Sequence, residues 1–133
     1  MDCLFCKIIA GEIPCYKVYE DESVLAFLDI FPCSKGHTVV IPKEHAETIW
    51  EMSNEDFQRV AGGLRAAAGR VEARLKPDAM NIGLNNGKIA GQAVPHVHWH
   101  IIPRYEGDGG GSMHSIVKSK EKIEVEGIAT LFS

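Results

Sequence analysis

The sequence predicts an α+β domain, with a five-stranded antiparallel sheet, one long helix and one or two short helices. Two observations support this class. Five short segments have strand-like composition and end at turn-forming residues, whereas one long segment repeats apolar residues at spacings of three and four. Short turns between strands favour antiparallel pairing with the helices on one face of the sheet. The length of 133 residues suits one domain, residues 1–133.

Five segments of the chain are predicted strands. Residues 16–21 and 23–30 form a predicted hairpin around Asp21 and Glu22. The third, fourth and fifth strands are expected at residues 36–42, 79–86 and 96–105. Pro42 should end the third strand, because proline has no N–H to donate to the sheet.

One long amphipathic helix is predicted within residues 53–77. Its apolar face is expected to carry Phe57, Val60, Ala61, Leu64, Ala68, Val71 and Leu75. Ser53 is the expected N-cap, and Pro77 stops the helix. Gly62 and Gly63 each cost ~1 kcal/mol against alanine, so they are either weak points or positions where another element packs closely. Shorter helical turns are expected at residues 5–14 and 45–52.

Charge and hydropathy argue against some classes of partner. The chain has 14 Lys and Arg and 18 Asp and Glu, a net charge of −4, which disfavours a surface that coats nucleic acid. No apolar run is long enough to span a membrane, and the start, MDCLFCKII, lacks the basic region of a signal peptide. We therefore expect a cytoplasmic protein with no membrane or nucleic-acid partner. The tail, residues 108–133, begins with a flexible glycine run and has no clear pattern.

The four cysteines are not expected to form disulfides in a reducing compartment. Cys3 and Cys6 form a C-x-x-C pair, which in that setting indicates either a metal site or redox chemistry. Cys15 and Cys33 have no evident partner and are expected to be buried thiols.

The most informative stretch is PHVHWHIIPR, residues 95–104, with His96, His98 and His100 at alternate positions. Side chains two residues apart on a strand share a face and lie roughly 7 Å apart. The three histidines should therefore point the same way, and Val97, Trp99 and Ile101 should face the core. An ordinary surface strand could carry one histidine, but three in register favour a functional site.

This stretch, HVHWHII, resembles the signature of the histidine triad (HIT) superfamily of nucleotide hydrolases and transferases. The segments CLFCKIIAGEIP, YEDESVLAFLDIFP, KGHTVVIPKEH, NNG and AGQAVPHVHWHIIPR also resemble the family's sequence blocks, in their usual order. The resemblance extends from residue 2 to about residue 106 and is closest to the small prokaryotic members. It implies a HIT-like fold and a homodimer, in which the long helix and residues 79–86 pair across the two-fold and the tail reaches toward the partner's site.

The resemblance implies different roles for the histidines. His98 would be the catalytic nucleophile, which attacks the α-phosphorus of a nucleotide and forms a nucleotidyl-histidine intermediate. A neutral imidazole is nucleophilic near pH 7 because its ordinary pKa is about 6.5. His100 would donate to phosphate oxygens. His37 would lie near the same phosphate, although alone it could equally be a polar residue that opens a strand.

The rest of the expected nucleotide site also comes from the resemblance. Asp29 would accept both ribose hydroxyls, and Phe5, Phe27 and Ile30 would line the base pocket, although both phenylalanines could be plain core. Ala93 stands where the best-known members have serine, so the chain has one hydroxyl donor fewer near the leaving group. The expected nucleotide-binding residues are Phe5, Phe27, Asp29, Ile30, His37, Asn85, Gly91, Gln92, Val94, His98 and His100.

The resemblance also implies a structural zinc. Some prokaryotic members hold zinc through a C-x-x-C pair, a histidine after the third strand and the first triad histidine. These positions correspond to Cys3, Cys6, His45 and His96. Four N and S ligands are the usual closed zinc set. The alternative is a reduced cysteine pair beside two unrelated histidines.

The activity expected from the resemblance is hydrolysis of a purine nucleotide, with an AMP- or GMP-like product. Cleavage of the P–N bond of a nucleoside phosphoramidate is the first hypothesis. Hydrolysis of dinucleoside polyphosphates is the alternative within the same chemistry. A nucleotide-binding regulatory protein with little catalysis is the rival from another class, and Ala93 is the residue that keeps it open. DNA-end processing is disfavoured by the net charge.

Overall fold

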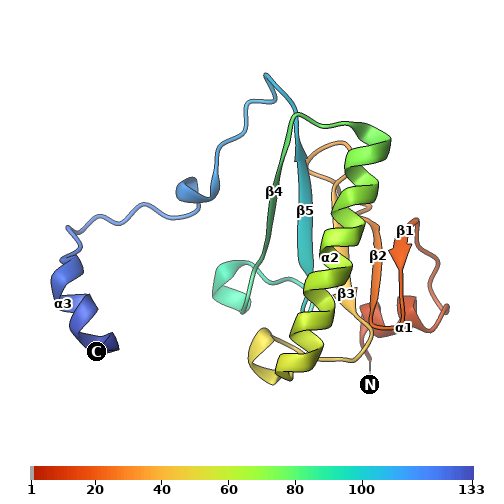
Figure 1. The fold of residues 1–133 in the computed structure, drawn as a ribbon, viewed down its shortest axis with the longest axis horizontal. Coiled ribbons are helices and arrows are strands. Elements are labelled where there is room, and N and C mark those ends of the chain that lie inside the picture. Colours follow the sequence, from red (N-terminus) through yellow and green to blue (C-terminus); the bar gives the residue numbers. More distant parts are fainter. Residues whose placement is uncertain (1) are drawn as a thin grey trace.

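The structure is a computed structural model, and it describes residues 2–133. It contains a five-stranded sheet in which every pairing is antiparallel, with the order β1-β2-β3-β5-β4 (Figure 1). The strands are β1 (Lys17–Glu20), β2 (Val24–Leu28), β3 (Thr38–Pro42), β4 (Ala79–Leu84) and β5 (Trp99–Arg104). The predicted fold class and the five strand positions are confirmed.

The hairpin between β1 and β2 is closed by one side chain. Asp21 Oδ1 accepts the backbone N–H groups of Ser23 and Val24 at 2.7 and 2.9 Å. Aspartate favours such turns because its short carboxylate can satisfy backbone donors that the strands leave free.

The long helix α2 spans Asn54–Leu75 and covers one face of the sheet. Ser53 Oγ accepts the backbone N–H of Asp56 at 3.1 Å, which confirms the predicted N-cap. The helix ends at Lys76, whose backbone is left-handed with φ 48°. Pro77 follows and cannot continue the helix.

The two central glycines of α2 behave differently. A Cβ on Gly63 would lie 2.3 Å from a methyl carbon of Val24, whereas a Cβ on Gly62 would meet nothing within 4 Å. Gly63 therefore lets α2 approach β2 closely, and Gly62 is only a weak point in the helix. The prediction for Ala61 was wrong, because Ala61 is exposed and Gly63 and Ala67 occupy the buried face.

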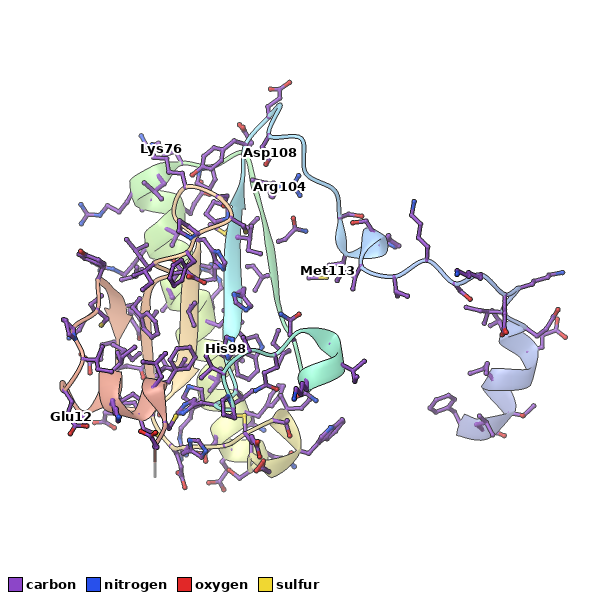
Figure 2. All side chains as sticks on the ribbon, turned by 180° about the vertical axis from the view of Figure 1, so that it is seen from behind. Glu12, Lys76, His98, Arg104, Asp108 and Met113 are labelled. Atoms are coloured by element: carbon purple, nitrogen blue, oxygen red, sulfur yellow. The ribbon has the colours of Figure 1, made fainter. Side chains whose placement is uncertain are left out.

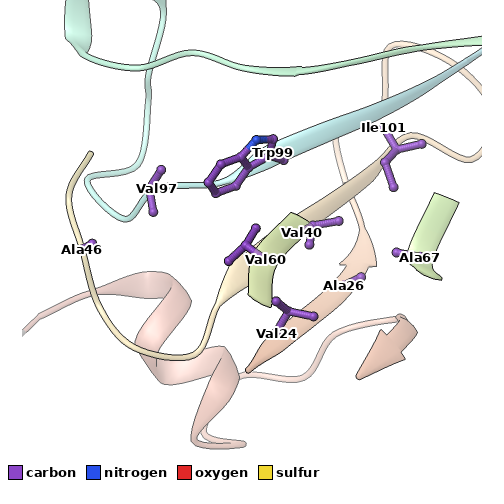
Figure 3. Packing of buried hydrophobic residues seen from close by; sticks show 9 residues of the cluster. All are labelled: Val24, Ala26, Val40, Ala46, Val60, Ala67, Val97, Trp99 and Ile101. Carbon is purple, nitrogen blue, oxygen red and sulfur yellow. The ribbon is translucent and has the colours of Figure 1, made fainter. Parts of the chain in front are cut away.

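Strands β2 and β3 divide their apolar side chains between two clusters, one on each face of the sheet. The cluster beneath α2 contains Val24, Ala26, Val40, Ala46, Val60, Ala67, Val97, Trp99 and Ile101 (Figure 3). The opposite cluster contains Cys3, Phe5, Leu25, Phe27, Val39 and Ile41. It packs against α1 (Leu4–Ile9). The helices therefore do not all lie on one face, because α1 covers the side that faces away from α2.

Several predicted elements are shorter than expected, including the helical turns at residues 5–14, where α1 already ends at Ile9. Residues 45–52 form only one 3₁₀ turn, η1 (Ile49–Glu51), because the carbonyls of Ala46 and Glu47 accept from Val97 N–H and the Gln92 amide instead of from a helical turn. Strand β5 begins at Trp99 and not at His96. Strand β4 ends at Leu84, opposite Trp99, and β3 pairs with β5 only through Val40, although β3 itself continues to Pro42.

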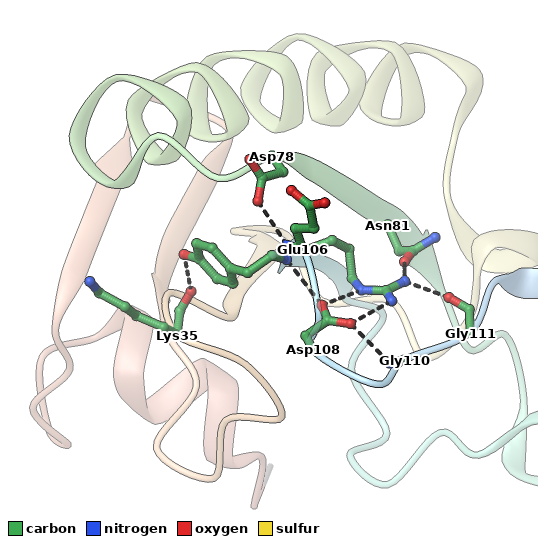
Figure 4. Close-up of polar contacts among 9 residues, drawn as sticks. Lys35, Asp78, Asn81, Glu106, Asp108, Gly110 and Gly111 are labelled. Carbon is green, nitrogen blue, oxygen red and sulfur yellow. Dashed lines mark hydrogen bonds and ion pairs between the residues drawn. The ribbon is translucent and has the colours of Figure 1, made fainter.

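The tail leaves the domain through a clasp on Arg104. The guanidinium donates to both carboxylate oxygens of Asp108 at 2.8 and 2.9 Å, to Asn81 Oδ1 at 2.7 Å and to the Gly111 carbonyl (Figure 4). A bidentate pair of this kind fixes orientation as well as distance. The glycine run is therefore anchored at its start, contrary to the flexible loop expected there.

Beyond the clasp the tail extends away from the sheet (Figure 1). Its elements are η3 (Met113–Ser115), α3 (Val125–Ala129) and η4 (Thr130–Phe132). Its apolar side chains are exposed, including Ile116, Val117, Val125, Leu131 and Phe132. Within residues 2–133, no helix combines the length and apolar character needed to cross a membrane.

Candidate active site

The histidine stretch presents its polar face away from α2. Val97, Trp99 and Ile101 belong to the cluster beneath α2, as predicted. Figure 2 shows His98 at the start of β5, on the side of the sheet that faces away from α2. The Phe5 ring lies edge-on to the rings of His96 and His98, with centroids 5.8 and 5.1 Å apart, so these two histidines share a side.

His98 has a defined tautomer. Its Nδ1 lies 2.8 Å from the backbone carbonyl of His96, and a carbonyl can only accept a hydrogen bond. The neutral ring therefore carries its proton on Nδ1 and has a free lone pair on Nε2. Burial lowers the pKa of His98, although the His96 carbonyl and Asp29 partly oppose this. The ring is thus neutral at neutral pH, with the lone pair of Nε2 free.

His100 contacts a second ring, that of His37. His37 Nε2 and His100 Nδ1 are 2.9 Å apart, and His37 Nδ1 accepts the backbone N–H of Cys33 at 3.2 Å. Burial and the neighbouring rings of His98 and His37 lower the pKa of His100 to about 4. Cys33 itself is exposed, not buried as expected, because it lies in the loop between β2 and β3.

Asp29 follows β2 at the edge of the same space. One carboxylate oxygen accepts the backbone N–H of Phe31 at 2.8 Å, and the other lies 3.7 Å from His37 Nε2. The second oxygen therefore remains available to a ligand.

A pocket of about 600 Å³ opens between these groups and α1. Of the predicted nucleotide-binding residues, it is lined by Phe5, Phe27, Asp29, Ile30, Asn85, Gly91, Val94, His98 and His100. Ala93 also lines it. Its walls are largely apolar and its polar groups few, which is typical of small-molecule sites.

Two predicted residues do not line this pocket. His37 lies behind His100, as described above. The Gln92 amide bridges the loop before the triad: Oε1 accepts Gly87 N–H at 2.8 Å, and Nε2 donates to the carbonyls of Glu47 and Val94 at 2.6 and 3.0 Å. Gln92 therefore shapes the loop from outside the pocket.

The sequence did not reveal one wall of the pocket. Ile13, Pro14, Cys15 and Tyr16 line it beside Ile8 of α1. These residues form an irregular link between α1 and β1, so no periodic pattern marked them. Their position depends on how α1 packs against the sheet.

A second cluster of polar side chains lies at the other edge of Phe5. Cys3, Cys6, His45 and His96 each direct one ligand atom to a common point, with all four atoms within 4.8 Å of one another. Cys3 Sγ is 3.4 Å from His96 Nδ1, Cys6 Sγ is 3.4 Å from His45 Nδ1, and the two Nδ1 atoms are 3.1 Å apart. Ligands around a tetrahedral zinc lie roughly 3.3–3.8 Å apart, so the donor set and its spacing fit such an ion.

The contacts around this cluster also suit a cation. His96 Nε2 lies 2.9 Å from the carbonyl of Pro42, so the proton of the neutral ring is on Nε2 and the lone pair on Nδ1 faces the cysteines. Cys3 Sγ accepts the backbone N–H of Cys6 at 3.4 Å, a contact that orients the sulfur at the N-cap of α1. Burial lowers the pKa of His96, which keeps the ring neutral.

Comparison with known families decides the identity of the fold. Residues 10–107 match the model of the HIT domain. The chain belongs to the HIT family. The match ends where the Arg104 clasp begins to direct the tail outward, so most of the exposed tail lies beyond the family's common domain.

Individual HIT relatives agree with this assignment. An uncharacterized HIT-like protein of Methanocaldococcus jannaschii is 52% identical over 123 residues, which cover 92% of this chain and 95% of the relative. An adenosine 5'-monophosphoramidase of Schizosaccharomyces pombe is 48% identical over 104 residues, covering 78% of this chain and 75% of that protein. A crystal structure of a HIT family protein from Bacillus anthracis has a TM-score of 0.85 and 44% identity, and covers 98% of this chain and 92% of that one.

Proposed function

We propose that this HIT-family chain hydrolyses purine nucleotides at the α-phosphate through a covalent intermediate on His98. The observation that carries the proposal is the bond from His98 Nδ1–H to the His96 carbonyl at 2.8 Å. It leaves a bare Nε2 on a ring that lines a pocket large enough for a nucleotide. A ligand whose ribose binds Asp29 and whose base lies against Phe5 and Phe27 would bring its phosphate toward the histidines.

The chemistry proceeds in two displacements. The lone pair of His98 Nε2 attacks the α-phosphorus, and the bond to the leaving group breaks with its electron pair on the leaving atom, which takes up a proton from solvent. Water then attacks the phosphorus and gives up a proton to solvent, the phosphorus–nitrogen bond to His98 breaks with its electron pair returning to Nε2, and the nucleoside monophosphate leaves. His100, on the same side, donates to the phosphate oxygens and stabilises the charge that develops there.

The preferred leaving group in this proposal is an amine, so that the reaction is a phosphoramidase reaction. The 48% identity to the Schizosaccharomyces pombe adenosine 5'-monophosphoramidase supports it. Dinucleoside polyphosphate hydrolysis is the second candidate. A smaller hollow of about 310 Å³ adjoins the pocket at Ala93 and includes Lys88, whose charge would suit an anionic leaving group. Parallel rates on adenosine phosphoramidate and diadenosine tetraphosphate separate the two.

The decisive variant for the chemistry is His98→Ala. We expect turnover to fall by at least about 10³-fold, because the covalent route is lost, while AMP binding measured by calorimetry stays within a few-fold. His114→Ala is the matched control, since His114 is an exposed histidine of the tail. Normal turnover by His98→Ala would exclude the mechanism. If the wild-type chain binds AMP but traps no nucleotidyl-enzyme in a burst experiment, it is a binding protein with little catalysis.

We also propose that Cys3, Cys6, His45 and His96 hold a structural zinc ion. The convergence of four N and S ligands and the Pro42 carbonyl behind His96 support it. Four protein ligands leave no coordination position for substrate. The ion would fix the turn between the two cysteines, and that turn carries Phe5, which contacts the His98 ring.

A homodimer is the third part of the proposal. Strand β4 is at the edge of the sheet, and its Ile82 is exposed. An unpaired edge with apolar side chains is a surface that proteins usually cover. In a dimer, α2 and β4 would pair across the two-fold, and the tail would reach toward the partner's pocket. Light scattering at micromolar concentration tests this, and a monomeric mass would contradict it.

A further inference from the structure

A line of hydrogen bonds runs behind the pocket from the backbone of Cys33 to the third histidine of the triad. Cys33 N–H donates to His37 Nδ1 at 3.2 Å, and His37 Nε2 lies 2.9 Å from His100 Nδ1. His37 is almost fully buried, at 6% exposure. Nothing in the proposed chemistry so far requires His37, because it does not line the pocket.

The direction of each bond follows from the chemistry of its first donor. A backbone N–H can only donate, so Nδ1 of His37 must be a bare nitrogen that accepts. A neutral imidazole has one N–H, so the proton of His37 is on Nε2. That proton faces His100 Nδ1 at 2.9 Å and Asp29 Oδ2 at 3.7 Å. The longer distance is outside hydrogen-bond range, so His37 donates to His100.

The same reasoning fixes the tautomer of His100. Its Nδ1 accepts from His37, so its single proton is on Nε2, at the opposite edge of the ring. Both rings are neutral near pH 7: burial lowers the pKa of His37 against the opposing effect of Asp29, and the pKa of His100 is about 4. His100 therefore has a fixed tautomer and offers one donor.

We propose that His37 is a positioning residue that holds His100 as an Nε2–H donor, opposite in tautomer to the neighbouring His98. The inference rests on the proposed function, which supplies the nucleotide phosphate that His100 would contact. His98 has its proton on Nδ1 because its partner is the His96 carbonyl, whereas His100 has its proton on Nε2 because its partner is the His37 N–H. One ring thus directs a lone pair at the phosphorus, and the next directs a proton at the oxygens.

This assignment also excludes a metal at Asp29, His37 and His100, although their ligand atoms lie within 4.8 Å of one another. An ion on His37 Nε2 would need that nitrogen bare, and the proton would move to Nδ1. There it would face the N–H of Cys33 at 3.2 Å, donor against donor. A metal would therefore have to break the bond to Cys33.

Long-range proton–nitrogen spectra of protein labelled with nitrogen-15 in histidine test the assignment directly. We expect Nε2 protonated and Nδ1 bare in both His37 and His100, and the reverse in His98. A proton on Nδ1 of His100 in the wild-type protein would overturn the inference. This readout needs no turnover, so it is independent of the proposed reaction.

A pair of variants connects the tautomer to rate. His37→Leu removes the donor, so His100 should populate both tautomers. We expect kcat to fall about 10- to 100-fold, less than the roughly 10²–10³-fold cost of deleting a well-placed donor, because part of the His100 population keeps its Nε2 proton. His37→Gln can place an amide N–H near the former Nε2, so we expect it to recover much of the loss. His98 should keep its Nδ1 proton in both variants.

The outcomes separate the two claims. An unchanged His100 tautomer and unchanged kcat in folded His37→Leu would overturn the positioning role. If the tautomers are as expected but no substrate gives a His98 intermediate, the proposed function fails while the tautomer assignment stands. His114→Leu controls for the loss of a histidine elsewhere.

Discussion

Two clusters of histidine nitrogens lie on either side of His98, and their protons are placed in opposite ways. In the cysteine cluster (Cys3, Cys6, His45 and His96), the Nδ1 atoms of the two histidines are 3.1 Å apart. In the histidine relay, which is the line of hydrogen bonds from the Cys33 N–H through His37 to His100, His37 Nε2 and His100 Nδ1 are 2.9 Å apart. The spacing alone does not distinguish them. The difference lies in the backbone group behind one ring: a carbonyl behind His96 and an N–H behind His37.

That backbone group decides where the single proton of a neutral ring lies. The Pro42 carbonyl draws the proton of His96 outward, so the bare Nδ1 of His96 faces the centre of the cluster, as a cation requires. The Cys33 N–H donates to His37 Nδ1, so the proton of the neutral His37 ring is on Nε2 and forms a hydrogen bond with His100 Nδ1. The two clusters look alike if only their ligand-type side chains are counted. They differ in the backbone group that contacts the outer nitrogen of a ring, which is a carbonyl at His96 and an N–H at His37.

The largest effect should come from the cysteine cluster. Cys6→Ser removes one ligand of the proposed zinc and leaves three others facing one another. We expect a loss of about 3–5 kcal/mol in stability, seen as a fall in Tm of roughly 10 °C or more. His37→Leu should lower Tm far less. An unchanged Tm in Cys6→Ser, together with no zinc in the wild-type protein, would contradict the proposed zinc site.

The next effect concerns Asp29, which borders the relay without taking part in it. Asp29→Asn removes a charged acceptor for ribose hydroxyls, worth about 2 kcal/mol, or roughly 30-fold in AMP affinity. Calorimetry with AMP measures this. The tautomer of His100 should not change, because the nearest Asp29 oxygen is 3.7 Å from His37 Nε2. A changed His100 tautomer would mean that Asp29 belongs to the relay.

The pH dependence of stability should differ between wild type and His100→Gln. The folded-state pKa of His100 is about 4, below the unfolded value of about 6.5. The unfolded chain therefore binds a proton first as the pH falls, and stability is lost from about pH 6.5 down to about pH 4. We expect a slope smaller by up to one proton in His100→Gln, measured by chemical denaturation across this range. Identical slopes would contradict a neutral, half-buried His100.

The smallest effect is expected at His114, which is exposed in η3 and lies outside both clusters. His114→Ala should change zinc content, AMP affinity and stability within error, with a stability change under about 0.5 kcal/mol. A clear loss of turnover here would instead indicate that the tail acts on an active site, as the proposed dimer would allow.

Much of the fold follows from local patterns in the sequence. The strands, the α2 cap at Ser53 and the inward alternation of Val97, Trp99 and Ile101 are confirmed. These features depend on periodicity and on residues close in the chain. The nucleotide-site residues were assigned by resemblance, and most of them line one pocket.

The features that the sequence did not predict depend on contacts between distant segments. Gly63 faces Val24 where Ala61 was expected inside, because the rotation of α2 is set by the sheet. The late start of β5 coincides with the end of β4, whose last residue Leu84 pairs with Trp99. The relay depends on a hydrogen bond from the backbone N–H of Cys33 to His37. Every residue except proline has a backbone N–H, so the sequence does not show which one contacts a given side chain.

The difference between the two clusters is tested most directly by the zinc content of purified, dialysed protein in three forms: wild type, Cys6→Ser and His37→Leu. We expect one zinc per chain in the wild type, little or none in Cys6→Ser, and one in His37→Leu. Two zinc ions per wild-type chain, or zinc kept in Cys6→Ser and lost in His37→Leu, would show that the relay binds metal and would contradict the hydrogen bond proposed between His37 and His100.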